Sequence, residues 1–169
     1  VFPCDKLGDE RVTKYFDLNR DYEQIKQTLS NIDENLAKSI TYGKGIRLLN
    51  QDLWEVLISF IISANNNIPR IKGIVEKISK AYGKEIIYKG KKYYTFPTPE
   101  ELSKASVEDL RKLGLGFRDK RIYETTRLIN ENTISLEEIE NFADTARARE
   151  ELLKLDGVGP KVADCILLF

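Results

Sequence analysis

The sequence of 169 residues contains no histidine, no methionine and only two cysteines. Without histidine, imidazole acid–base chemistry and His-ligated metals are excluded within this chain, so carboxylates, lysines and amides must carry any reaction. The two cysteines, Cys4 and Cys165, are too few for a disulfide framework, and a reducing cytoplasmic, nucleoid or nuclear setting is the default expectation. Apolar runs of about 18 residues and a signal-peptide pattern are also missing, so we expect neither a transmembrane helix nor a secretion signal.

Because methionine is absent, we expect that the chain does not begin at a translation start. It stops on the apolar run 166–169, which would leave a hydrophobic helix end without a cap or a partner. We therefore expect these residues to be an excerpt of a longer chain. The 41% apolar and 32% charged content is typical of a globular domain that is long enough to bury a core.

The net charge is zero, because 27 basic residues balance 27 acidic ones. This balance argues mildly against a nucleic-acid partner, since phosphate neutralisation dominates affinity for DNA. The distribution is uneven, however: residues 70–92 are rich in lysine and arginine against only Glu76 and Glu85, and residues 111–127 are similarly basic. Charge alone leaves two interpretations open, a nucleic-acid surface and ordinary solvated helix faces.

Apolar periodicity and capping residues predict a mainly α fold. The run 53–62 is apolar on nearly all faces and predicts the buried central helix of the core, with a buried strand as the alternative. One strand signal, residues 86–96, predicts a small β-hairpin around residues 89–91, more typical of a basic edge than of a base-stacking platform. Further helices are predicted over 9–16, 22–29, 33–40, 69–82, 106–114, 117–129, 136–142 and 143–155, with a short one after Thr98.

The most informative stretch is 152–169, which has the pattern of a helix end, a glycine turn and a new helix start. Gly157 and Gly159 tolerate positive φ, and Pro160 suits the first position of a helix. The N–H groups of such a turn and helix start bind anions well, and a phosphate diester is an obvious guest. Lys161 follows in the first turn, where the positive helix end disfavours its ammonium form, so it is a candidate amine nucleophile. A solvated lysine beside a plain tight turn is the alternative.

Two other loops have unusual composition. Three consecutive asparagines, 65–67, stand between the buried helix and the next one, more than an N-cap requires. Residues 113–118 read Leu-Gly-Leu-Gly-Phe-Arg, and their two glycines allow a close turn that places Phe117 and Arg118 at the start of a helix. For the asparagines, the alternative is simple helix capping. For Phe117, the alternative is a phenylalanine buried in the core.

Together the three motifs resemble those of the 8-oxoguanine DNA glycosylases, a branch of the helix-hairpin-helix DNA glycosylase superfamily. The hairpin string is Leu-Asp-Gly-Val-Gly-Pro-Lys-Val-Ala-Asp-Cys at 155–165, and the loop string is Ser-x-Asn-Asn-Asn-Ile-x-Arg at 63–70. The resemblance covers roughly residues 45–169. It implies that residues 1–169 form a helical glycosylase-type domain, incomplete at its C-terminus, with the helix-hairpin-helix at 144–169. The family's N-terminal β domain is expected to be absent.

The resemblance implies a bifunctional DNA N-glycosylase and abasic-site lyase of base-excision repair, in which Lys161 attacks the sugar C1′. Cys165 would lie against the extruded base or pair electrostatically with Lys161, and a small buried apolar residue is the alternative. Phe117 stands where the family has tyrosine, so stacking is retained and the hydroxyl is lost. The implied DNA contacts are Asn65 as the wedge in the duplex, Asn66 beside it, Arg70, Phe117 and Arg118 around the orphaned cytosine, and the amides of Gly157, Gly159 and Val162 at a phosphate.

The same resemblance implies no required cofactor, but a structural monovalent or divalent cation on the backbone carbonyls of Leu153, Leu155 and Val158. The expected partner is duplex DNA that contains oxidised guanine opposite cytosine, bound by a monomer without a membrane. The family's essential aspartate would lie beyond Phe169, so we expect the excerpt to be weakly active or inactive. Two rivals stay open: an oxidised-pyrimidine glycosylase of the same superfamily, which the asparagine loop argues against, and a non-catalytic helix-hairpin-helix module with Lys161 as a phosphate contact.

Overall fold

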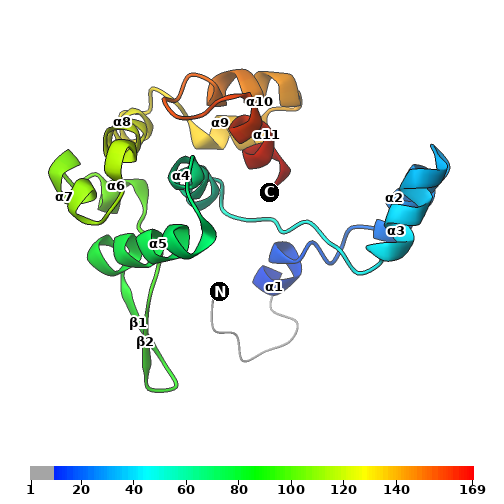
Figure 1. Cartoon of the computed structure of the whole chain (residues 1–169), viewed down its shortest axis with the longest axis horizontal. Coiled ribbons are helices and arrows are strands. Elements are labelled where there is room, and N and C mark those ends of the chain that lie inside the picture. The colour runs from blue at the N-terminus through cyan, green and yellow to red at the C-terminus, as the bar shows by residue number, and fades with distance from the viewer. Residues whose placement is uncertain (1–9) are drawn as a thin grey trace. The chain divides into compact units, whose positions relative to one another are not determined.

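The computed structural model of the chain describes residues 10–169 (Figure 1). The chain divides into two compact units, residues 1–51 and 52–169. Cys4 and the first residue of the helix predicted over 9–16 lie outside the described residues. The fold is mainly helical, as predicted, and within residues 10–169 the sheet structure is limited to one two-stranded antiparallel sheet. Across this described part, we find no helix with the length and apolarity needed to cross a membrane.

The first unit contains three short helices, α1 (Glu10–Tyr15), α2 (Tyr22–Ser30) and α3 (Glu34–Tyr42). Asp21 and Asp33 cap α2 and α3, because the Asp21 carboxylate accepts one backbone N–H group at the start of α2 and the Asp33 carboxylate accepts two at the start of α3. α2 and α3 pack side by side (Figure 1). Side-chain caps are thus seen for α2 and α3, and none of the three helices contains a buried residue within the described residues 10–51.

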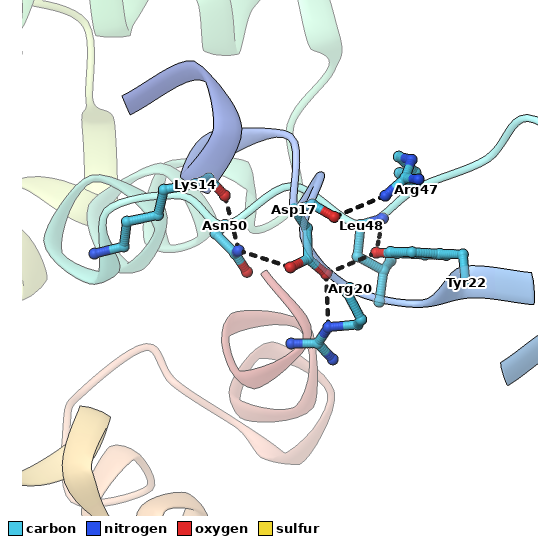
Figure 2. A network of polar contacts seen from close by, with 7 residues as sticks. All are labelled: Lys14, Asp17, Arg20, Tyr22, Arg47, Leu48 and Asn50. Carbon is cyan, nitrogen blue, oxygen red and sulfur yellow. Dashed lines mark hydrogen bonds and ion pairs between the residues drawn. The ribbon is translucent and has the colours of Figure 1, made fainter. Parts of the chain in front are cut away.

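A polar network around Asp17 ties the segment after α3 to the turn between α1 and α2 (Figure 2). The Asp17 carboxylate accepts hydrogen bonds from the Tyr22 hydroxyl (3.0 Å) and the Asn50 amide (3.4 Å), and it pairs with Arg20 (2.7 Å). The Asp17 carbonyl accepts a further bond from Arg47 (2.7 Å). Asp17 has a φ of 51°, a left-handed conformation that aspartate tolerates better than most residues. These contacts hold the segment after α3, which lies outside the helices, against the turn between α1 and α2.

In the second unit, α4 (Leu53–Ser63) is the central helix that its apolar run predicts. Asp52 caps its start, and most of its length is buried, with Leu57, Ile58, Ile61 and Ile62 fully inaccessible to solvent. Four helices contact α4 and enclose it: α5 (Ile68–Tyr82), α8 (Asp119–Asn130), α9 (Leu136–Asn141) and α11 (Pro160–Leu168). The alternative of a buried strand over 53–62 is therefore wrong.

The remaining elements of the second unit are short. β1 (Glu85–Tyr88) and β2 (Lys91–Tyr94) form the predicted hairpin, which projects from the helices in Figure 1. Its turn consists of Lys89 and Gly90, both with positive φ, so Lys91 belongs to the strand and not to the turn. Capping boxes begin α6 (Pro99–Leu102) and α7 (Val107–Lys112). The helix predicted over 143–155 is the shorter α10 (Thr145–Leu152), which leads into the glycine turn.

Candidate DNA-binding and catalytic site

The glycine turn between α10 and α11 forms as predicted. Gly157 has a φ of 90°, and the Val158 N–H donates to the Leu155 carbonyl at 3.1 Å. α11 begins at Pro160, and Gly159 at its N-cap supplies no side-chain hydrogen bond. Gly159 and Pro160 are exposed. The first N–H groups of α11 therefore face outward at the positive end of a helix, a suitable place for a phosphate.

Lys161 is exposed in the first turn of α11, and Cys165 is a half-buried free thiol four residues further along the same helix. Asp164 of α11 forms an ion pair with Arg149 of α10, with 2.6 Å between the Arg149 Nε and the carboxylate. This ion pair fastens the two helices of the hairpin to each other. Within residues 10–169, Lys161 forms no ion pair of its own, so its amine is accessible to a substrate.

The asparagine loop between α4 and α5 separates into capping residues and one exposed residue. The Asn66 amide donates to the Ile62 carbonyl (3.0 Å) at the end of α4, and the Asn67 side chain accepts the Arg70 N–H (3.0 Å) at the start of α5. The capping interpretation is thus correct for these two residues. Asn65 is exposed with a φ of 49°, and its side chain makes no hydrogen bond within the described structure. Of the three asparagines, Asn65 is therefore the one whose side chain is free to contact a ligand.

The turn at residues 113–118 also forms where the two glycines predict it, with φ of 98° at Gly114 and 61° at Gly116. Phe117 and Arg118 lie in a short 3-10 turn, Gly116–Arg118, that leads directly into α8. Phe117 is 56% exposed, so the interpretation as a core phenylalanine is wrong. Arg118, in contrast, is 1% exposed. The contact between Arg118 and the orphaned cytosine that the resemblance implies stays a prediction, and in this structure the Arg118 side chain lies in the interior.

Three arginines connect these segments, which lie far apart in the sequence. Arg70 of α5 donates to the Gly114 carbonyl (3.1 Å), and Arg118 donates to the Asn65 carbonyl (2.9 Å). Arg121 of α8 pairs with Asp156 in the glycine turn, with 3.5 Å between Nε and the carboxylate. The asparagine loop, the Phe117 turn and the glycine turn of the hairpin are thereby brought together, as the three motifs require if they act on one ligand.

The electrostatics around Phe117 are positive. The guanidinium carbons of Arg118 and Arg121 lie 4.3 Å and 5.4 Å from the centre of the Phe117 ring, within range of a cation–π contact. Burial lowers the pKa of Arg118, and the neighbouring charges of Arg70 and Arg121 lower it further. The sequence analysis missed Arg121, although its position four residues after Phe117, near the start of a predicted helix, was a usable signal.

Gly157→Ala is expected to destabilise the glycine turn, whereas Gly159→Ala is not. Gly157 has a φ of 90°, where an L side chain costs roughly 1–2 kcal/mol, and an added Cβ would meet Arg121 Cδ at 2.8 Å. Gly159 has an ordinary φ, and an added Cβ finds open space. Urea denaturation of both variants measures the difference. Equal midpoints for the two would contradict the left-handed turn.

Comparisons with known proteins agree with this arrangement. Residues 58–161 match the model of the HhH-GPD superfamily of base excision DNA repair proteins, and residues 5–57 match that of the 8-oxoguanine DNA glycosylase N-terminal domain. The second match includes a stretch in which sequence reasoning found no family motif. The N-glycosylase/DNA lyase of Saccharomyces cerevisiae is 41% identical over 170 residues, covering 92% of this chain and 44% of that protein. The fold and site define a helix-hairpin-helix base-excision repair protein.

Two further relatives are named as glycosylase/lyases. The probable N-glycosylase/DNA lyase of Methanothermobacter thermautotrophicus is 37% identical over 180 residues, covering 95% of this chain and 56% of that protein. A crystal structure of the Clostridium acetobutylicum 8-oxoguanine glycosylase/lyase with double-stranded DNA containing cytosine opposite 8-oxoguanine has a TM-score of 0.89 and 46% identity, covering 96% of this chain and 57% of that one. The chain belongs to the HhH-GPD superfamily of base excision DNA repair proteins, whose model matches more than half of it. It spans about half the length of the curated relatives it matches.

Proposed function

We propose that this chain carries the DNA-binding and nucleophilic part of a glycosylase and abasic-site lyase that removes 8-oxoguanine opposite cytosine in base-excision repair. The observation that carries the proposal is the convergence of the asparagine loop, the Phe117 turn and the Lys161 hairpin through Arg118 and Arg121. The likeness to the Clostridium enzyme solved with such a duplex supports the same substrate. We also propose that the protein acts as a monomer inside the cell.

Extrusion of a base from duplex DNA costs a few kcal/mol of lost stacking, which inserted side chains offset. Asn65 and Phe117 suit this role because both are exposed on adjoining turns, and the Phe117 ring offers a stacking face. Arg70 supplies positive charge beside them at the protein surface. The outward amides of Gly157, Gly159 and Val162 hold a backbone phosphate, which fixes the position of the duplex relative to Lys161.

In the chemical step, the neutral amine of Lys161 attacks C1′ of the sugar. The new N–C1′ bond replaces the bond to the base, which departs with the bonding electron pair and takes up a proton equivalent to the one that the amine releases. Ring opening gives a Schiff base between Lys161 and the sugar. Loss of a C2′ proton then expels the 3′ phosphate by β-elimination. Cys165, half-buried one turn along α11, borders the extruded base.

The backbone carbonyls of Leu153, Leu155 and Val158 are our candidates for a structural cation. Leu155 and Val158 are buried, and the Leu155 carbonyl already accepts the Val158 N–H, which leaves it one lone pair. Three neutral carbonyls suit a weakly held hard cation. No cluster of acidic, cysteine or histidine side chains that would hold a metal occurs in the described part of the chain. Such a cation would stabilise the turn and takes no part in the reaction steps above.

The substrate class is tested by incision and binding assays on duplexes with 8-oxoguanine opposite cytosine, with an oxidised pyrimidine, and without damage. We expect the 8-oxoguanine duplex to be preferred by at least about tenfold, since a site with fixed polar groups discriminates by 1.4 kcal/mol or more. The chain alone and any longer polypeptide that carries it should rank the three duplexes in the same order. A preference for the oxidised pyrimidine supports the first rival, and binding without incision by the longer polypeptide supports the non-catalytic module.

A further inference from the structure

The solvent side of α5 carries a row of basic residues that the site described above does not use beyond its first member. Arg70, Gly73, Lys77 and Lys80 follow one another at spacings of three or four residues, so they lie along one side of the helix. The apolar side of α5 packs on the core, and this row lies on the opposite side. We call these four residues the α5 ridge.

The protein does not neutralise the lysines of the α5 ridge. Lys77 and Lys80 are exposed, and neither forms an ion pair within residues 10–169. Lys84, four residues further along, differs from them because it pairs with Glu101 at 3.3 Å. Like charges at helical spacing destabilise a helix slightly, so the two free lysines do not serve the stability of α5. They are available to an anionic partner.

Gly73 lies in the middle of the α5 ridge, where the fold itself does not require glycine. Its φ is not positive, and an added Cβ would find open space among the described residues. Glycine is the poorest helix former after proline, so alanine would suit this position of α5 better. What glycine provides here is a helix backbone that another molecule can approach closely.

The α5 ridge fits the sugar-phosphate backbone of a DNA duplex. From Arg70 to Lys80 the helix rises about 15 Å. Phosphates of one strand follow one another at about 3.4 Å along the duplex axis, so this length covers roughly four of them. Lysines bind phosphates as point charges, and the bare backbone at Gly73 lets the strand lie close between them.

The α5 ridge is also continuous with the surface that we assign to DNA. Its first residue, Arg70, donates to the Gly114 carbonyl at 3.1 Å, in the turn that carries Phe117. A duplex held at that turn therefore has the start of the ridge beside it. The sequence left open whether the basic run 70–92 is a nucleic-acid surface, and this continuity favours that interpretation for the ridge.

We propose that the α5 ridge binds the phosphate backbone of the duplex that flanks the lesion, and that it supports binding to undamaged DNA without a part in base excision. The proposal rests on the proposed function, since the ridge extends the surface assigned to DNA there. Phosphate contacts supply most of the nonspecific affinity and carry no sequence information. The ridge thus holds the protein on a duplex whether or not a damaged base is present.

Lys77→Gln and Lys80→Gln test the charges, each against Lys104→Gln, because Lys104 is exposed, forms no ion pair in the described part of the chain and lies outside α5. Fluorescence anisotropy on an undamaged duplex is measured over a range of salt. Each ridge variant should lose at least about fivefold in affinity at low salt, and its slope of log affinity against log salt should fall by about 0.9. Unchanged slopes, or the same change in Lys104→Gln, would overturn the proposal.

Incision separates the α5 ridge from the chemistry. In the longer polypeptide that carries this chain, single-turnover incision of the 8-oxoguanine duplex at saturating protein should change by less than about twofold in Lys77→Gln, because a lost binding contact is offset by excess protein. A loss of incision that saturating protein does not restore would place this lysine in the reaction and contradict the proposal.

Gly73→Leu tests the close approach of the strand. Leucine is a good helix former and its Cβ finds open space, so the urea midpoint should rise. Affinity for the undamaged duplex should nevertheless fall by at least about threefold, because the new side chain stands between the helix and the strand. A raised midpoint together with unchanged affinity would show that no strand lies against Gly73.

The two proposals fail in distinguishable ways. If the wild-type protein binds no duplex, both fail. If it binds and the longer polypeptide incises the 8-oxoguanine duplex, while Lys77→Gln, Lys80→Gln and Gly73→Leu bind like the wild type, the proposed function stands and the α5 ridge is an ordinary solvated helix face.

Discussion

Lys161→Gln is expected to lower strand incision at an abasic site by at least about 10³-fold, because an amide cannot form a Schiff base with the sugar. Affinity for the duplex should change by less than about threefold, since the variant loses one charge among many contacts. Lys161 is exposed in the first turn of α11, so this substitution removes no buried contact. Single-turnover incision and fluorescence anisotropy on the same duplex measure the two quantities separately.

Lys104→Gln is the matched control, because Lys104 is also exposed and lies outside the candidate site. It removes the same charge and should leave incision unchanged within about twofold. If Lys161 is instead a phosphate contact, Lys161→Gln weakens binding and incision together, and the slope of log affinity against log salt falls by about 0.9. That pattern would favour the non-catalytic module.

Leu57→Ala is expected to destabilise the second unit by about 2–5 kcal/mol, the range for truncating a fully buried leucine. Leu57 is 0% exposed in the middle of α4, which four other helices enclose. A loss of this size should lower the midpoint of thermal unfolding by on the order of 10 °C. Thermal denaturation followed by circular dichroism measures it, and urea denaturation gives the free energy directly.

Ile87→Ala is the control for that experiment, since Ile87 is 68% exposed on β1. It removes an aliphatic side chain of the same size and should cost less than about 1 kcal/mol. Equal losses for the two variants would show that α4 is not the packed centre of this unit.

The sequence predicted those parts of the fold that have local signals. The apolar run of α4, the helix starts after Thr98 and at Ser106 and the glycine turn at Gly157 all formed where nearby residues indicated. These features depend on side chains within a few positions of the backbone groups that they satisfy. Their prediction therefore needs no knowledge of tertiary contacts.

The contacts between distant segments could not be predicted in this way. Arg118 was expected at the DNA surface, yet its partners Ala64 and Asn65 lie more than fifty residues earlier in the chain. Likewise, the Asp17 network recruits Asn50 from 33 residues away in the first unit (Figure 2). Whether an arginine faces solvent or a row of buried carbonyls depends on where another loop ends, and no local pattern encodes that position.

The most direct test of the central claim, that Lys161 is the nucleophile, is borohydride trapping on a duplex with a preformed abasic site, followed by peptide mapping of the adduct. Such a site needs no base excision, so the trap reports on the amine itself. We predict a covalent protein–DNA adduct on the peptide that contains Lys161, and its loss in Lys161→Gln but not in Lys104→Gln. An adduct on another lysine, or duplex binding without any adduct, would contradict the account.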